Sequence, residues 1–260
     1  MEGGVDAKKS LGQHWLNDEP SLETISTSID ISNDDTVLEI GPGLGSLTAK
    51  LANKAKKVIA VELDSKAIGY LTSNLNLPNL KIIHADILKF DLTTLPADYK
   101  VVANIPYYLT SNLLRVLCTS SNPFSQAALL VQKEVAQRAA AEPGKMSLLS
   151  VGVQLYCEVK TGQIIEANKF DPPPKVDSQI LILNRRKDLL FIDIDNKKFF
   201  RLVRAGFSQR RKTLLNSLSG GLGLNRDEVS GLIELAGILP TRRPQTLSLE
   251  EWHKLYREIN

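Results

Sequence analysis

The chain has few cysteines and no long apolar run, and these absences narrow its class. Its 260 residues include two cysteines, Cys118 and Cys157, which lie far apart without a Cys-x-x-Cys pair, and its three histidines are not clustered. Neither a disulfide framework nor a zinc site is indicated, and both thiols are expected to be small apolar filler. No run approaches the roughly 20 apolar residues of a membrane span, and no basic segment with an apolar stretch opens the sequence. A reducing, cytoplasmic location is the expectation.

Charge is nearly balanced overall but unevenly distributed. The net charge is +3, yet residues 1–183 carry 17 Lys and Arg against 20 Asp and Glu, whereas residues 184–260 carry 15 against 9. The basic tail includes Arg204, Arg210, Arg211 and Lys212. Such density predicts contacts with a nucleic-acid phosphate backbone, which bring affinity without sequence specificity. A solvated helix face is the alternative for a single basic run.

The first two thirds of the chain alternate short apolar runs with amphipathic segments, which predicts parallel strands joined by helical crossovers. The expected strands span 36–40, 57–62, 80–84, 100–103, 126–131, 157–166 and 177–184. One intervening helix should begin at an N-cap at Thr110 or Ser111. Helical segments then follow at 195–206, 209–219, 226–236 and 248–258. The predicted organisation is an α/β domain over 1–185 and a small helical domain over 186–260.

A glycine turn follows the first expected strand, in the segment 38–45 (Leu-Glu-Ile-Gly-Pro-Gly-Leu-Gly). Glycines let the backbone approach a ligand closely at the carboxyl edge of a sheet, so Gly41 is a candidate cofactor contact. The third glycine of a dinucleotide fingerprint would fall at position 46, which is Ser46. A nicotinamide cofactor is therefore disfavoured.

Acids follow the next two expected strands. Glu62 ends its apolar run where a ribose diol needs acceptors, while Asp64 is expected to be the N-cap of the following helix. Asp86 follows the third strand and could accept from an adenine amine. With the glycine turn and Asn104, these acids lie at four successive strand ends, which converge on one crevice in a parallel sheet. A nucleotide-like cofactor is predicted there.

The tetrapeptide Asn104-Ile105-Pro106-Tyr107 comes directly after an apolar run and combines acceptors with an aromatic face. When an exocyclic base amine is methylated, its nitrogen becomes tetrahedral and partly positive, so acceptors aimed at its hydrogens favour the transition state. The Asn104 side-chain carbonyl and the backbone carbonyl of Ile105 or Pro106 could serve. Tyr107 or Tyr108 could stack on a flipped base. Taken alone, Asn-x-Pro after a strand is more often an ordinary turn.

Taken together, these features resemble class I S-adenosylmethionine-dependent methyltransferases, and in detail the KsgA-type small-subunit rRNA adenine N6,N6-dimethyltransferases. The resemblance covers nearly the whole chain. It is carried by 8–16 (Lys-Lys-Ser-Leu-Gly-Gln-His-Trp-Leu), the glycine turn, Glu62, Asp86, 104–107, 170–178 (Phe-Asp-Pro-Pro-Pro-Lys-Val-Asp-Ser) and 207–212 (Phe-Ser-Gln-Arg-Arg-Lys). It implies a Rossmann-like seven-stranded methyltransferase sheet, a small C-terminal all-α domain, S-adenosylmethionine as methyl donor and no metal.

The same resemblance implies site roles. Residues matching His14, Leu16, Gly41, Glu62, Asp86 and Asn104 line the cofactor pocket in that family. Asn104 also faces the target amine, and the aromatics matching Tyr107 and Phe170 sandwich the adenine. Trp15 stands where the family usually has Phe, which leaves the shape of the pocket wall open. From the residues alone, 13–16 could dock into the core instead of covering the crevice, and Phe170 could only anchor a loop.

The function implied is direct, in-line methylation of N6 on two adjacent adenines near the 3′ end of 16S rRNA, giving N6,N6-dimethyladenosine. The expected partner is the immature 30S particle, with Lys175 adding a phosphate contact, and the protein is expected to be a monomer active in subunit biogenesis. Three alternatives are a large-subunit dimethyltransferase of the macrolide-resistance type, a non-catalytic assembly or RNA-binding factor, and a protein or small-molecule methyltransferase. The segment 170–178 and the basic tail favour the small-subunit branch.

Overall fold

The computed structural model describes residues 8, 11–209 and 211–259. Two compact units divide the chain: the first holds the residues up to 136 together with 157–185, and the second holds 137–156 together with 186–260. The sequence analysis placed 137–156 in the first domain, whereas this segment groups with the C-terminal unit. None of the described helices is long and apolar enough to cross a membrane.

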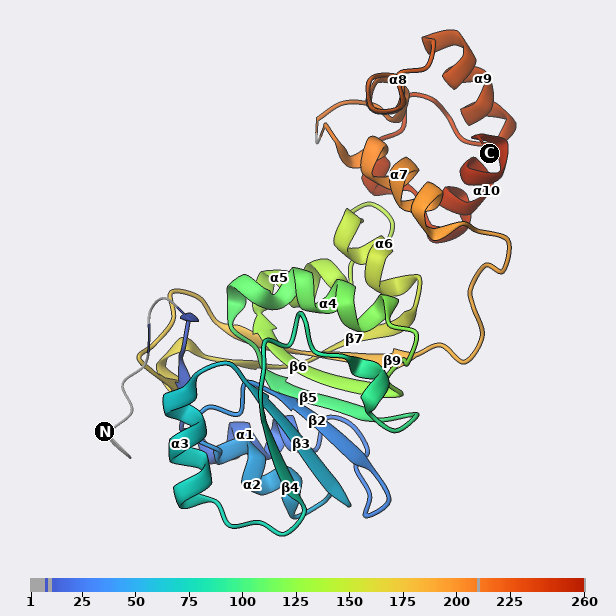
Figure 1. Ribbon diagram of the computed structural model, residues 1–260. Helices are drawn as coiled ribbons and strands as arrows, with labels where there is room; N and C mark the ends of the chain where they lie inside the picture. Colours follow the sequence, from blue (N-terminus) through green and yellow to red (C-terminus); the bar gives the residue numbers. More distant parts are fainter. Residues whose placement is uncertain (1–7, 9–10, 210, 260) are drawn as a thin grey trace. The chain divides into compact units, whose positions relative to one another are not determined.

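A seven-stranded sheet forms the centre of the first unit, with the order β4-β3-β2-β5-β6-β9-β7 (Figure 1). Its strands are β2 (Thr36–Ile40), β3 (Lys57–Glu62), β4 (Leu80–His84), β5 (Lys100–Asn104), β6 (Gln126–Gln132), β7 (Cys157–Ile165) and β9 (Ser178–Arg185). The strands β4, β3, β2, β5 and β6 pair in parallel. Both β7 and β9 run antiparallel to their neighbours, so the expectation of parallel strands is wrong for these two. They extend the sheet beyond β6, away from the four strands expected to hold the cofactor.

Helices cover both faces of this sheet. Figure 1 shows α1 (Glu19–Ser26) and α2 (Ser46–Ala52) on one face and α4 (Thr110–Thr119) on the other, while α3 (Ser65–Asn74) connects β3 to β4. The inward faces are apolar, and the central strands are almost completely buried, as parallel strands covered on both sides must be. The predicted N-cap of α4 is wrong: Leu109 occupies that position, and Thr110 is already helical because a 3-10 turn over Tyr107–Leu109 leads directly into the helix.

A second, two-stranded sheet was not predicted. The strand β1 (Trp15–Leu16) pairs antiparallel with β8 (Phe170–Asp171), with Leu16 opposite Phe170. Two residues are too short to show a period in the sequence, so no pattern signals either strand. This pairing ties the segment before α1 to the segment between β7 and β9.

The second unit is helical. It contains α6 (Leu148–Gln154), α7 (Asn196–Phe207), α8 (Leu214–Leu222), α9 (Arg226–Leu235) and α10 (Leu249–Ile259), and α5 (Lys133–Ala139) spans the boundary between the units. Its helices pack closely: a Cβ on Gly206 of α7 would come within 2.4 Å of the buried Trp252 ring of α10, so only glycine fits there. The helix expected at 209–219 begins only at Leu214, because the Thr213 side chain caps it by accepting from the Asn216 N–H.

Candidate active site

A pocket lies at the carboxyl ends of the four adjacent strands β2, β3, β4 and β5. It brings together every residue that the sequence analysis assigned to cofactor or base: His14, Leu16, Gly41, Glu62, Asp86, Asn104, Pro106, Tyr107 and Phe170. Parallel pairing produces this convergence, because it brings the carboxyl ends of neighbouring strands to one edge. The pocket is also lined by Gln13 and Trp15, which were expected only as part of a segment that could cover the crevice, and by Glu39, to which no role was assigned.

The glycine turn forms one wall of the pocket. Gly41, Gly43 and Gly45 have φ angles of 66°, 57° and 87°, a left-handed region that glycine enters without strain. A Cβ on Gly41 would meet nothing within 4 Å, so open space lies above this part of the turn. A Cβ on Gly43 would lie 2.5 Å from Cζ3 of Trp15. The indole therefore rests directly on the turn, which shows how the ring at position 15 shapes the pocket wall.

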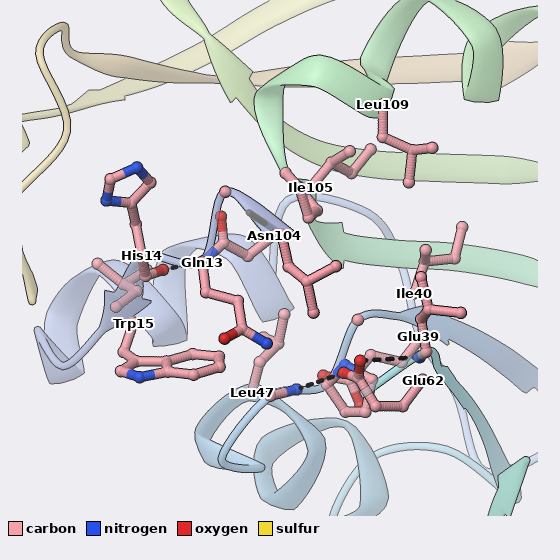
Figure 2. Close-up of a pocket in the computed structure, with 18 of the residues that line it drawn as sticks. Gln13, His14, Trp15, Glu39, Ile40, Leu47, Glu62, Asn104, Ile105 and Leu109 are labelled. Atoms are coloured by element: carbon pink, nitrogen blue, oxygen red, sulfur yellow. Dashed lines mark hydrogen bonds between the residues drawn. The ribbon is translucent and has the colours of Figure 1, made fainter. Parts of the chain in front are cut away.

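Glu62 ties the end of β3 to the glycine turn. Its Oε1 accepts from the backbone N–H groups of Leu63 and Asp64, both at 2.8 Å, and its Oε2 accepts from the Gly43 N–H at 3.3 Å (Figure 2). The residue is 7% exposed, and its carboxylate is fixed by three donors. Its orientation is thus set before any ligand arrives, and remaining lone pairs can accept from a sugar hydroxyl.

Asp86 occupies the corresponding place after β4. Its Oδ1 accepts from the Leu88 N–H at 3.0 Å, while the exposed Lys89 ammonium lies 4.0 Å from Oδ2. The side chain is partly accessible and lines the pocket. Its position allows acceptance from an amine, as the sequence analysis expected.

Asn104 is oriented by the N-terminal segment. Its Nδ2 donates to the backbone carbonyl of His14 at 3.3 Å (Figure 2). Because a carbonyl can only accept, the amide nitrogen must face His14, and Oδ1 is turned away as an acceptor. The carbonyl of Pro106 already accepts from the Leu109 N–H at 2.9 Å, which makes the Ile105 carbonyl the better second acceptor.

The aromatic side of the pocket is held by two polar contacts. The Tyr107 hydroxyl bonds to Ser178 Oγ at 2.8 Å, and the Tyr107 ring stacks on His14 with centroids 5.9 Å apart and planes 27° apart. His14 Nδ1 donates to the Pro172 carbonyl at 2.7 Å, which fixes the imidazole ring. Phe170 is buried by its strand pairing with Leu16. The adenine sandwich between Tyr107 and Phe170 therefore remains a prediction. The ring that lies beside Tyr107 in this structure is that of His14.

Glu39 is the functional candidate that the sequence analysis missed. It is the fourth of the five residues of β2, is 1% exposed, and borders the pocket. Burial raises the pKa of Glu39 to about 8; the Thr48 hydroxyl lowers it somewhat, and the Glu62 carboxylate raises it further. The sequence did contain a signal for Glu39, namely an acidic residue inside an otherwise apolar strand. Asp and Glu are almost never buried without a partner.

Asp64 anchors the N-terminal segment that covers the pocket. It caps α3, as predicted, through the Lys66 N–H, and it also accepts from Lys8 Nζ at 2.7 Å and Gln13 Nε2 at 3.1 Å. Burial acts to raise the pKa of Asp64, but these hydrogen bonds, chiefly that from Lys8, outweigh it and lower the pKa below the usual range. The charged anchor is thus present at neutral pH and is lost only in acid, as the pH falls through that lowered pKa.

We expect Asp64→Asn to loosen this segment, because the change removes the charge and turns one acceptor into a donor. Limited proteolysis should cut on the N-terminal side of Leu16 about threefold to tenfold faster, in proportion to the population of the detached segment. Asp91→Asn is the matched control, because Asp91 caps a 3-10 turn through Thr93 in the same way. Equal cleavage rates for Asp64→Asn and wild type would show that Asp64 is not the anchor.

The basic candidates are exposed. Arg204 lies on the outer face of α7 in the second unit, Arg211 and Lys212 follow that helix, and Lys175 is exposed in the first unit. Arg210 lies outside the described residues. A side chain that contacts a phosphate must be exposed, but a side chain that contacts only water is exposed as well. RNA binding at these positions therefore stays a prediction.

Comparisons with known proteins agree on one family. The profile described as "Ribosomal RNA adenine dimethylase" matches residues 4–260. A protein named Ribosomal RNA small subunit methyltransferase A from Dehalococcoides mccartyi is 43% identical over 263 residues, covering 99% of this chain and 90% of its own. A protein of the same name from Clostridium botulinum is 42% identical over 253 residues, covering 95% and 92%.

Solved structures show the same likeness. A dimethyladenosine transferase from Plasmodium falciparum is 29% identical with a TM-score of 0.78, covering 93% of this chain and 96% of its own. The 23S rRNA methyltransferase ErmE is 26% identical with a TM-score of 0.73, covering 94% and 98%.

Proposed function

The chain belongs to the ribosomal RNA adenine dimethylase family, and on this premise we propose that it methylates N6 of two adjacent adenines near the 3′ end of 16S rRNA. Membership makes it an enzyme that dimethylates adenine in rRNA. The choice of the small subunit is supported by relatives named for that subunit at 42–43% identity, whereas ErmE, named for 23S rRNA, is 26% identical. The observation that carries the proposed chemistry is the orientation of Asn104 by the His14 carbonyl.

S-adenosylmethionine is the proposed methyl donor, and the pocket fits it. The turn leaves open space above Gly41 for a close backbone contact, and Glu62 and Asp86 offer acceptors for a ribose and an adenine amine. The buried Glu39 also lines this pocket, and its Oε2 has no hydrogen-bond partner among the described residues. His14, Leu16 and Asn104 complete the proposed cofactor contacts, on the side nearest the aromatic residues.

The proposed mechanism is alignment followed by direct transfer. The cofactor supplies a methyl group already activated by a positively charged sulfur. Asn104 Oδ1 and the Ile105 carbonyl accept from the two hydrogens of the target amine and stabilise the charge that develops on its nitrogen. Tyr107, fixed by Ser178, provides a face for the base, and Pro106 restricts the backbone of the preceding residue, Ile105, whose carbonyl is one of the two acceptors. Neither a metal nor a strong base takes part in this scheme, and the surplus proton leaves to solvent.

The proposed partner is the immature 30S particle, encountered in the cytoplasm. Arg204, Arg211 and Lys212 on the second unit, together with Arg210, would contact rRNA phosphates, and Lys175 would do so on the first unit. Such contacts add affinity and salt dependence, while the pocket selects the base. A role in subunit biogenesis accompanies this proposal, with the monomer as the acting form.

The direct test uses labelled S-adenosylmethionine with unmethylated 30S and 50S particles, followed by mass spectrometry of the RNA. We expect dimethyladenosine at two adjacent positions of 16S rRNA and none in 23S rRNA. Label in 23S rRNA alone would instead indicate a large-subunit dimethyltransferase of the macrolide-resistance type. No incorporation into either particle, with cofactor binding intact, would favour the assembly-factor alternative.

A further inference from the structure

Tyr108 carries an exposed aromatic ring at the edge of the pocket. The residue is 61% exposed, and no other Phe, Tyr or Trp among the described residues reaches the exposed class. It lines the same pocket as Asn104 and Tyr107, and its hydroxyl has no hydrogen-bond partner in the described part of the chain. An apolar surface left open to solvent beside a binding site is typical of a surface that a ligand covers.

Tyr107 and Tyr108 offer two separate rings and not one slot. Both belong to the 3-10 turn Tyr107–Leu109, in which three residues complete a turn, so successive side chains point about 120° apart. The Tyr107 hydroxyl reaches Ser178, whereas the Tyr108 ring lies beside Gly12, where a Cβ would come 3.3 Å from Cδ1 of Tyr108. With the target adenine proposed on the anchored ring of Tyr107, the ring of Tyr108 remains for another group.

The proposed substrate brings a second base to this place. When one base is flipped into a pocket, the base next to it in the RNA loses a stacking partner, and that loss opposes flipping. Unstacked bases regain such a contact on aromatic side chains. The Cα atoms of Tyr107 and Tyr108 are only about 3.8 Å apart, so the second ring lies within reach of a nucleotide covalently joined to the target.

We propose that Tyr108 is a stacking platform for the base that adjoins the target adenine in the RNA. This inference rests on the proposed function. The ring takes the place of the stacking partner that the adjoining base loses, and it thereby stabilises the flipped state. Because Tyr108 lies on one side of the pocket, it receives the neighbour on one side of the target. For one of the two adjacent adenines, that neighbour is the other adenine.

Substitutions at Tyr108 separate stacking from packing. Tyr108→Leu keeps apolar bulk beside Gly12 but has no flat ring, and Tyr108→Phe keeps the ring. On unmethylated 30S particles below saturation, we expect single-turnover methylation to fall at least about fivefold for Tyr108→Leu, from the loss of one base–aromatic stack. Tyr108→Phe should stay within about twofold of wild type, because only the unpartnered hydroxyl is lost. Tyr70→Leu is the matched control, because Tyr70 lies on α3 and does not line the pocket.

Changes in the RNA locate the base on the ring. Two kinds of 30S particle are reconstituted, each with one of the two adjacent adenines replaced by uridine, which stacks less strongly. One of the two replacements should slow methylation of the remaining adenine by wild type about threefold to tenfold, and this slowing should be absent with Tyr108→Leu. The dependence of one effect on the other is what direct contact between ring and base requires.

The affinity for S-adenosylmethionine, measured by calorimetry, tests the purely structural role. It should change less than about twofold in Tyr108→Leu, since the ring is proposed to contact RNA and not the cofactor. A loss of cofactor affinity as large as the loss of methylation would overturn the inference and assign Tyr108 to holding residues 11–16 over the cofactor.

Three other results would also overturn it. The first is wild-type methylation by Tyr108→Leu, and the second is a uridine effect that is missing in wild type or equal in both proteins. The third is complete loss of methylation by Tyr108→Leu on every particle, which would place the target adenine itself on Tyr108. If wild type methylates neither adenine of the unaltered particle, the proposed function fails instead.

Discussion

Asn104→Ala is expected to lower single-turnover methylation of 16S rRNA by a factor on the order of 10²–10³, the usual effect of removing one preorganised transition-state contact. The side chain provides the acceptor Oδ1, and its Nδ2 donates to the His14 carbonyl. Loss of the acceptor acts on the transition state, so most of the effect should appear in the rate of the chemical step. Cofactor binding, measured by calorimetry, should weaken by less than about tenfold, because only one of several contacts is lost.

Two further variants make the result specific. Asn104→Asp keeps acceptor oxygens but cannot donate to His14, so it should fall between wild type and alanine. Asn74→Ala is the matched control, because the Asn74 amide donates only within its own helix, to Tyr70, in the described structure. Turnover by Asn104→Ala within a few-fold of wild type would remove this residue from the proposed catalytic role.

Gly43→Ala is expected to reduce cofactor affinity by about 100-fold, corresponding to about 3 kcal/mol. Two costs combine. Alanine in the left-handed region at φ 57° costs about 1–2 kcal/mol, and its Cβ would lie 2.5 Å from Trp15, so the indole must move. Both the turn and the ring are walls of the pocket, so any movement that relieves the strain alters the binding surface. Calorimetric titration with S-adenosylmethionine measures the loss.

A double-mutant cycle separates the two costs. In the Trp15→Ala background the contact is absent, and Gly43→Ala should then cost at least about 1 kcal/mol less than in wild type. Gly237→Ala is the backbone control, because Gly237 has a φ of 74° with nothing within 4 Å of its Cβ. Additive effects of Trp15→Ala and Gly43→Ala would show that the indole does not constrain the turn.

The sequence predicted the order of strand ends that builds the pocket. Some apolar runs end in a residue type that is unusual in a core, such as Glu62 or Asn104, and the bounds of the seven strands match the expected ranges to within one residue. Parallel pairing then places those ends together without further information. The side-chain cap predicted for Asp64 is confirmed, because capping is a local interaction.

What the sequence did not reveal depends on contacts between distant segments. Glu39 is buried in the sheet, and only the packed structure shows that no hydrogen-bond partner from the described part of the chain reaches its Oε2. The antiparallel direction of β7 and β9 is set by pairing across the sheet, not by their composition. The grouping of 137–156 with the C-terminal unit is likewise a property of packing.

The pairing of β1 with β8 also bears on when the site is completed as the chain folds. Trp15 and Leu16 are synthesised first, yet their partners Phe170 and Asp171 come after six of the seven strands of the main sheet. Closing so long a loop is slow compared with forming local turns and helices. The glycine turn and the acids can therefore take their places early, while the indole that rests on that turn gains its strand partner late. During synthesis, the glycine turn and the acids of the cofactor pocket therefore form before Trp15 and Leu16 are held over them by pairing with β8.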